Sequence, residues 1–402
     1  MELVERFIKY CQIDTQSDPN SHLTPSTSKQ YNLANLLVNE LKELGIDDAY
    51  VDEYCVVYGH LKSNCGSTVK MGFNAHMDTS DAMSGKDVKP RIIENYDGED
   101  IVLNKDVTTD VKSYPFLKDM KGKTLVVTDG TTLLGADDKA GIAIIMEVLE
   151  TLVKNPNIKH CPIRVCFTTD EETGDGIANF NYDLFKVDFA YTLDGSDCNC
   201  ICYENFNGDD AIVKLHGVSI HPGTAKDRLI NAIKLASEFN DMLDPLCAPE
   251  HSDGRQGFNH PVEISGTCEE AKLSYIVRNF DIDELHKQEE ELLKAQDKMN
   301  AKYGYKACEV SIVEGYKNMK DSFKDNTYSI DLVKKAMNEL NMNYKEEAIR
   351  GGTDGARLSC NGLLCPDLGT GGRNYHGVHE LWCLDEAKEV LNLVLKIVSI
   401  VD

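Results

Sequence analysis

Apolar residues recur at helical spacing in several long parts of the chain. Near the N-terminus they predict one helix over residues 3–11 and a second that Ser26 or Thr27 caps and Gly45 ends. A third, strongly apolar helix is predicted over 140–153. Shorter apolar runs predict strands at 50–54, 56–61, 69–75, 124–127, 163–167 and 189–193.

Strands and helices alternate through this first part of the chain, which predicts parallel pairing with right-handed crossovers. A histidine or a carboxylate follows several of the predicted strands, as His76, Glu172 and Asp194 do. In open α/β sheets, ligands bind at the carboxyl ends of the strands. The pattern therefore predicts a functional site at that edge, and the long, weakly patterned stretch 79–123 is typical of an elaborated functional loop.

The pattern changes after residue 205 and predicts a compact α+β unit, which we interpret as an insertion. Its predicted elements are strands at 211–215, 273–280 and 307–313 and helices at 227–243 and 282–302. We therefore expect an α/β fold, in which a central, mostly parallel mixed sheet is flanked by helices and carries a smaller α+β lid domain. The expected boundaries are 1–206 and 316–402 for the two parts of the main domain and 207–315 for the insertion.

The net charge of the chain limits the kinds of molecule that it can bind. The chain has 42 Lys and Arg against 67 Asp and Glu, a formal net charge of −25. This argues against nucleic acid and anionic membranes and admits a metal ion or a cationic substrate group. The N-terminus lacks the apolar core of a signal peptide, and the 14 cysteines are mostly scattered, so we expect a cytoplasmic setting with free thiols. We interpret Cys198, Cys200 and Cys202, which are spaced by two, as buried strand residues.

Two adjacent aspartates, Asp137 and Asp138, stand just before the apolar helix. Like charges this close raise each other's pKa unless a cation neutralises them, and a metal ion is the simplest such cation. The alternative is an ordinary acidic pair favoured by the helix macrodipole. Four further residues with metal-ligand chemistry favour the metal: His76, Glu172, Asp194 and His376.

Each of these residues, taken singly, is better explained by a turn, a solvated loop or the protein surface. Together, at strand ends and Gly-rich turns, they predict a site for zinc or a similar ion, with Asp137 as the natural bridge between two ions. Asp78 stands two positions after His76 and can hold the second ring nitrogen. Glu171, beside Glu172, can act as a general base, which predicts hydrolysis of a carbonyl compound, most simply an amide.

The motifs that carry these residues resemble those of the co-catalytic zinc exopeptidases, the family of glutamate carboxypeptidases, succinyl-diaminopimelate desuccinylase and aminoacylases. The matching segments, in chain order, are 76–80, 135–141, 170–172, 194–195 and 374–380. Within the family the chain resembles the tripeptide aminopeptidases, through 84–88, 93–96, 221–226 and 349–356. The resemblance covers essentially the full length.

The resemblance implies two zinc ions per chain, which Co²⁺ or Mn²⁺ can replace. His76, Asp137 and Asp194 would hold one ion, and Asp137, Glu172 and His376 would hold the other. It also implies a cis peptide between Asp137 and Asp138. The implied activity is hydrolysis of the N-terminal peptide bond of tripeptides by a metal-bound hydroxide, with Asp78 and Glu171 as catalytic residues.

Four residues are implied in substrate binding. The resemblance assigns His221 to the developing oxyanion and Arg350 to the substrate carboxylate, with Arg278 and Asn207 as weaker candidates for the same pocket. The alternatives are a loop histidine, a surface ion pair and a linker turn. Because the middle domain dimerises in some relatives and supplies the histidine to its partner, both a monomer and a homodimer remain open.

Two other functions stay open at this point. A dipeptidase, carboxypeptidase or N-acyl amino acid deacylase of the same family would share the metal site. A non-catalytic relative, acting as a scaffold, would lack Glu171 or a metal ligand, and none of these residues is missing.

Overall fold

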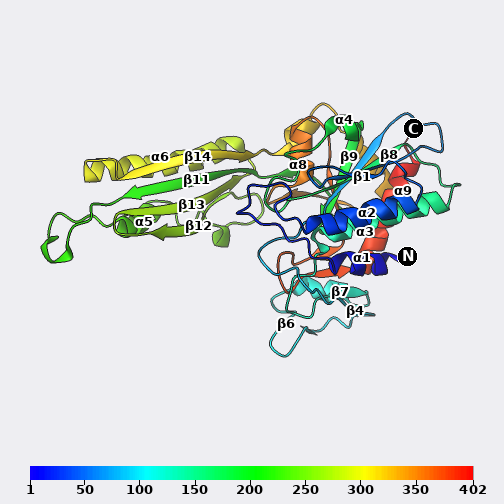
Figure 1. Cartoon of the computed structure of the whole chain (residues 1–402), viewed down its shortest axis with the longest axis horizontal. Coiled ribbons are helices and arrows are strands. Elements are labelled where there is room, and N and C mark those ends of the chain that lie inside the picture. Colours follow the sequence, from blue (N-terminus) through cyan, green and yellow to red (C-terminus); the bar gives the residue numbers. More distant parts are fainter. Residues whose placement is uncertain (402) are drawn as a thin grey trace. The chain divides into compact units, whose positions relative to one another are not determined.

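Two compact units make up residues 1–401, the part of the chain that the computed structural model describes (Figure 1). The first unit comprises residues 1–203, 319–347 and those from 353 onward. The second comprises residues 204–318 and 348–352. None of the described helices is long and apolar enough to cross a membrane.

An eight-stranded sheet, in the order β1-β2-β8-β3-β9-β16-β10-β15, forms the centre of the first unit. Strands β8, β3, β9 and β16 are parallel, whereas β1, β2 and β10 run antiparallel to their neighbours. This confirms the expected mixed, largely parallel sheet. The bounds are β1 Tyr50–Val51, β2 Val57–Leu61, β3 Met71–His76, β8 Ile163–Thr168, β9 Phe189–Gly195, β10 Cys200–Asn205, β15 Lys345–Ile349 and β16 Asp367–Gly369.

Helices flank this sheet, as predicted. Helix α3 packs against β3 and β9, and both α1 and α9 pack against α3. Because α3 has neighbours on several sides, nearly all of its residues are buried, which explains its almost continuous apolar pattern. The helices of this unit are α1 Leu3–Cys11, α2 Gln30–Glu43, α3 Ala136–Lys154, α4 Tyr182–Phe185, α7 Tyr328–Glu339, α8 Asp354–Cys360 and α9 Leu384–Ser399.

The stretch 79–123 contains short elements that the sequence pattern missed, because strands of two or three residues leave no periodic signal. They are β4 Arg91–Ile93, β5 Ile101–Val102, β6 Thr108–Thr109 and the 3₁₀ helix η1 Pro115–Met120. A small sheet in the order β17-β18-β7-β4 joins this stretch to the C-terminal part of the chain. Its other strands are β7 Leu125–Val127, β17 Gly372–Arg373 and β18 Leu381–Cys383.

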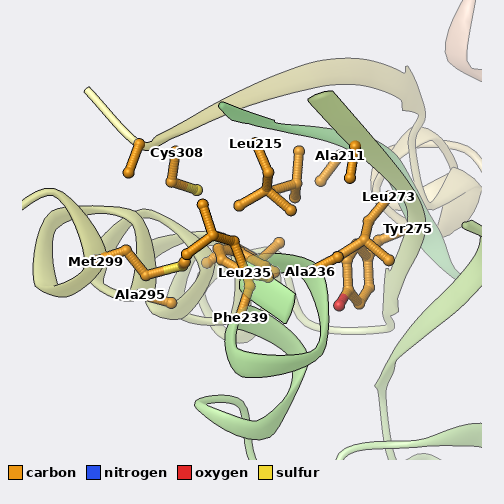
Figure 2. Packing of buried hydrophobic residues seen from close by; sticks show 14 of the residues in the cluster. Ala211, Leu215, Leu235, Ala236, Phe239, Leu273, Tyr275, Ala295, Met299 and Cys308 are labelled. Carbon is orange, nitrogen blue, oxygen red and sulfur yellow. The ribbon is translucent and has the colours of Figure 1, made fainter. Parts of the chain in front are cut away.

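The second unit is an antiparallel sheet in the order β12-β13-β11-β14, with helices α5 and α6 packed against it. Figure 2 shows its core, where Leu235 and Phe239 of α5 lie beside Leu215 and Leu273 of the sheet. The strand β12 was missed because most of it is exposed. The bounds are α5 Ala232–Asp241, α6 Ile282–Tyr303, β11 Asn207–His216, β12 Phe258–Gly266, β13 Glu270–Asn279 and β14 Cys308–Tyr316; short 3₁₀ turns are η2 Pro222–Thr224, η3 Pro249–His251 and, in the first unit, η4 Met319–Phe323.

The predicted cap of the second helix was wrong. Helix α2 begins at Gln30, and no side chain caps it. The Ser26 hydroxyl instead donates to the carboxylate of Asp170 at 2.5 Å, and Gln30 donates to the same carboxylate at 2.6 Å. The polar loop before α2 therefore holds the turn that carries Glu171 and Glu172, a long-range role that local capping rules do not reveal.

Candidate active site

The carboxylate of Asp137 lies between two histidine rings. Its Oδ1 is 2.8 Å from Nε2 of His76, and its Oδ2 is 3.1 Å from Nε2 of His376. Asp137 stands at the start of α3, His76 ends β3, and His376 lies in the loop between β17 and β18. One oxygen therefore faces each ring, which is the arrangement expected of a carboxylate shared by two metal ions.

Two further carboxylates complete two groups of possible ligands around Asp137. Oδ1 of Asp194 is 3.6 Å from Nε2 of His76, and Oε2 of Glu172 is 3.1 Å from Nε2 of His376. In each group of three, the ligand atoms all lie within 4.8 Å of one another. The structure thus brings together the five residues that the sequence singled out as metal ligands.

The parallel sheet explains this convergence. His76 is the last residue of β3, Asp194 lies near the end of β9, and Glu172 follows β8. Strand β3 is paired in parallel with both β8 and β9, so their carboxyl ends meet at one edge. The site therefore lies where ligands bind in open α/β sheets.

Asp78 supports both the histidine and the glutamate turn. Nδ1 of His76 is 3.0 Å from the main-chain oxygen of Asp78 and 3.3 Å from its Oδ1. The same carboxylate accepts hydrogen bonds from the backbone N–H groups of Glu171 at 3.0 Å and Glu172 at 3.1 Å. Asp78 thus holds the turn of Glu171 and Glu172 as well as facing the ring, which the sequence did not indicate.

Glu380 is a buried residue of the site to which sequence reasoning gave no role. Its carboxylate accepts backbone hydrogen bonds from Leu134 at 2.6 Å, Gly135 at 2.8 Å and Asp137 at 3.1 Å. These bonds fix the loop that presents Asp137, where the peptide between Asp137 and Asp138 is cis. The only sequence signal was its place at the end of the motif 374–380.

Two more buried carboxylates hold the backbone of metal-ligand candidates. Asp138 accepts from the N–H of His76 at 3.2 Å, and Asp367 accepts from the N–H of Asp194 at 3.3 Å. Asp367 was missed because it reaches the site from β16, far along the chain.

The acids and histidines shift one another's pKa in the metal-free protein. Burial and the charge of Asp137 raise the pKa of Glu172 to about 7 and that of Asp194 to about 6. Hydrogen bonds to Asp137 and Glu172 raise the pKa of His376 to about 11. Burial alone would raise the pKa of Asp137, but hydrogen bonds from His376 and His76 lower it. The site therefore concentrates negative charge that cations must balance.

The donor set fits divalent metal ions of the zinc type, because it consists of imidazole nitrogens and carboxylate oxygens. Oε1 of Glu172 is buried without a hydrogen-bond partner among the described residues, so one of its oxygens is left for a ligand. The side chain of His376 is 46% exposed, which leaves the site open on one side.

The four substrate-binding candidates all belong to the second unit. His221 is exposed, and its Nδ1 accepts the N–H of Gly223 at 3.1 Å, so its Nε2 is available to a ligand. The Asn207 side chain is buried and used within its own unit: its amide donates to the carbonyls of Asn279 and Phe280 and its oxygen accepts from the N–H of Asn318. These bonds account for Asn207 structurally.

The two arginines differ in what they leave free. The guanidinium of Arg350 donates through Nη1 to the carbonyls of Gly254 and Gln256 and through Nη2 to the hydroxyl of Ser252. Arg278 donates through Nη1 to the carbonyls of Asp209 and Val277, and the same Nη1 is 3.6 Å from Oδ1 of Asp210, the ion pair given above as the alternative. Its Nη2 and Nε bond to no described residue. The Nη2 and Nε groups of Arg278 are therefore left to bind a carboxylate, whereas in Arg350 mainly Nε is left for this.

Known proteins resemble the chain over nearly its whole length. It is 45% identical over 403 residues to the peptidase T of Alkaliphilus oremlandii, covering 99% of this chain and 98% of that one. Its fold matches a tripeptidase from Staphylococcus aureus with a TM-score of 0.78 at 22% identity, over 99% of this chain and 97% of that chain. It also matches a Bacillus subtilis protein described as a dinuclear metal-binding peptidase of the M20 family, with a TM-score of 0.64 at 13% identity, over 99% and 97%.

The model of peptidase family M20/M25/M40 matches residues 125–399. This range contains four of the five metal-ligand candidates, and the fifth, His76, completes the cluster from β3. The match and the full-length relatives confirm the family resemblance that the motifs indicate. The chain belongs to peptidase family M20/M25/M40, a family of metal-dependent peptidases.

Proposed function

We propose that this peptidase removes the N-terminal residue of tripeptides and uses two divalent metal ions, zinc in the first instance. His76, Asp137 and Asp194 would hold one ion, and Asp137, Glu172 and His376 the other. Such ions supply Lewis acidity, which lowers the pKa of bound water towards about 7 and polarises a substrate carbonyl. Support comes from relatives such as the peptidase T of Alkaliphilus oremlandii.

The observation that carries the proposal is the placement of Asp137. Each of its two oxygens faces a different histidine nitrogen, at 2.8 and 3.1 Å. Two histidine nitrogens, one at each oxygen, match the two positions at which a shared carboxylate meets two ions. We therefore assign Asp137 as the shared ligand of the two ions.

Glu171 is the general base of the proposal. It takes a proton from the attacking water and returns it to the leaving amine. Asp78 holds the backbone of Glu171 and Glu172 together, so the base and the neighbouring metal ligand keep a fixed relation. Burial raises the pKa of Glu171, and the charge of Asp354 adds to this, which makes the carboxylate a better proton acceptor.

An arginine receives the far carboxylate of the substrate in this proposal. Arg350 and Arg278 are the candidates, and Arg278 has the freer fork. His221 contributes to stabilising the oxyanion through its free Nε2. In this proposal the arginine that binds the substrate carboxylate is separate from the general base. The enzyme therefore recognises the length of its substrate, which favours peptides of one length.

The test is a substrate panel assayed with zinc or cobalt and again with a chelator. We expect cleavage of Leu-Gly-Gly with release of leucine, and little cleavage of Leu-Gly, Leu-Gly-Gly-Gly or N-acetyl-Leu-Gly-Gly. The chelator should abolish activity. Glu171→Gln should lower kcat on Leu-Gly-Gly by about 10²–10⁴-fold while metal content is kept.

The outcomes separate the alternatives. Metal-dependent cleavage of the dipeptide or of the acetylated substrate would retain the two-metal site and discard the tripeptide specificity. An unchanged kcat in Glu171→Gln would reject that residue as the base. Arg278→Lys and Arg350→Lys are compared with wild type. Replacing the arginine that binds the substrate carboxylate should raise KM, and the other variant should keep a KM close to that of wild type.

A further inference from the structure

A second histidine, His379, stands three residues after the metal-ligand candidate His376, and the proposed reaction gives it no role. Neither group of possible metal ligands around Asp137 includes it. Its Nδ1 instead lies 2.9 Å from Oγ1 of Thr109 in β6, and the centroid of its ring is 5.2 Å from that of Tyr114. His379 therefore contacts the stretch 79–123 through a hydrogen bond and through its ring.

The loop that carries His376 has a backbone conformation that depends on surrounding contacts. His376 itself has a φ of 64°, and Asn374 has a φ of 56°. Residues other than glycine adopt such values uncommonly, because the conformation costs free energy. It persists where the surrounding structure holds it. The place of the His376 ring therefore depends on the contacts that fix this loop.

Hydrogen bonds fix the loop on both sides of His376. The Asn374 amide donates to the carbonyl of His379 at 3.2 Å, which joins the start of the loop to its end. The hydroxyl of Thr128 donates to the carbonyl of Val378 at 3.0 Å. Because the bond from Asn374 ends on His379, a displacement of His379 also affects the residues that precede His376.

The stretch 79–123 offers His379 a packed surface. Its buried apolar side chains form one cluster with residues of β7 and β18, and Tyr114 packs against this cluster. Thr109 is buried, and Ile101, its partner in the pairing of β5 with β6, belongs to the same cluster. Both partners of His379 are thus held by a core, so they can hold the loop of His376 in turn.

We propose that His379 is a positioning residue, which fastens the loop of His376 to the stretch 79–123 and so keeps the His376 ring where a metal ion binds. The inference rests on the proposed function, in which Asp137, Glu172 and His376 hold one of two ions, called the second ion below. It gives the stretch 79–123 a role, because this stretch then supports a metal ligand from outside the central sheet.

The test removes one side of the hydrogen bond at a time in the full chain and measures zinc binding to the metal-free protein by calorimetry. Thr109→Val and His379→Phe should each weaken binding of the second ion by about 10–100-fold and affect the ion of His76 and Asp194 much less. Thr108→Val is the matched control, because Thr108 is the exposed neighbour in β6, and it should bind both ions as wild type does.

Two further variants separate the hydrogen bond from other effects of the substitutions. His379→Asn keeps a hydrogen-bonding group close to the place of Nδ1 and should bind the second ion more tightly than His379→Phe, which keeps only a ring beside Tyr114. The double variant Thr109→Val/His379→Phe should lose no more affinity than the larger of the two single losses, because both changes break the same bond.

Three results would overturn the proposal: single losses that add in the double variant, a second-ion affinity equal to that of wild type, or an equal loss of both ions. The last result indicates general damage to the fold. If His379→Phe did not fold, the comparison of Thr109→Val with Thr108→Val would decide alone.

A failure of the proposed function gives a different result. Wild-type protein that bound a single ion would contradict the two-ion site, and the variants would then be compared on that ion. A lower affinity in Thr109→Val but not in Thr108→Val would still support the role of His379, whereas equal affinities would reject it.

Discussion

The carboxylate of Glu380 accepts hydrogen bonds from three backbone N–H groups, those of Leu134 and Gly135 just before α3 and that of Asp137 at its start. An amide at this position has only one acceptor oxygen, and its NH₂ would face a backbone donor. Glu380→Gln should therefore lower metal affinity by about 10–100-fold, as loss of groups that orient metal ligands does. It should also lower the free energy of unfolding by about 1–3 kcal/mol, because buried donors lose their partner.

Metal titration and denaturant unfolding measure these two effects. Glu94→Gln is the control, because Glu94 is exposed and far from this loop in sequence. If Glu380→Gln had the same metal affinity and the same free energy of unfolding as wild type, the backbone N–H groups of Leu134 and Gly135 would not need a carboxylate as their acceptor.

The pH dependence of metal binding is a second prediction at the scale of single residues. Without metal, hydrogen bonds to Asp137 and Glu172 raise the pKa of His376 to about 11, so its ring is protonated at neutral pH. A metal needs the unprotonated ring, so binding must release protons. Raising the pH favours that release, and affinity should rise about tenfold per pH unit for each proton released.

Glu172 also makes metal affinity rise with pH, because its pKa of about 7 leaves it partly protonated at neutral pH and a metal binds the unprotonated carboxylate. Calorimetry in buffers of different ionisation enthalpy counts the protons. His376→Gln should reduce the count, and a metal affinity that did not vary between about pH 6 and pH 8 would contradict the linkage.

At the scale of elements, the contact between α3 and β9 depends on a glycine. A Cβ at Gly141 would lie 2.0 Å from the carbonyl oxygen of Leu193 and 2.6 Å from Oδ1 of Asp138. Gly141→Ala must therefore push α3 away from β9, next to the ligand candidate Asp194. We expect a loss of about 1–3 kcal/mol in the free energy of unfolding and weaker metal binding.

Thermal unfolding and metal titration of Gly141→Ala check this. Gly351→Ala is the matched control, because no atom lies within 4 Å of its added Cβ and its φ is not positive. Equal stability of the two variants would mean that the α3–β9 contact adapts without cost.

The long elements and the metal-ligand candidates could be predicted because their signals are local. Helix α3 shows an apolar run, and His76 and Asp194 stand at or near the ends of apolar strands. What could not be predicted depends on distant partners. Ser26 was expected to cap a helix but bonds to Asp170, and Asp367 reaches the site through a strand of three residues. Neither leaves a periodic pattern.

At the scale of the whole molecule, residues 204–318 form almost all of the second unit. Their main core includes Leu235 and Phe239 of α5, and no residue of 348–352 belongs to it (Figure 2). The two ends of the segment lie side by side, since the N–H of Asn318 donates to Oδ1 of Asn207 at 2.9 Å. A domain with its own core and adjacent ends can fold alone.

We therefore predict that the fragment 204–318 unfolds cooperatively on heating, as measured by circular dichroism. Leu235→Ala should lower its free energy of unfolding by about 2–5 kcal/mol, because Leu235 is buried in the core. Ile264→Ala should change it by less than about 0.5 kcal/mol, since Ile264 is 61% exposed on β12. A fragment that melted without cooperativity, or two variants of equal stability, would show that this core needs the rest of the chain to form.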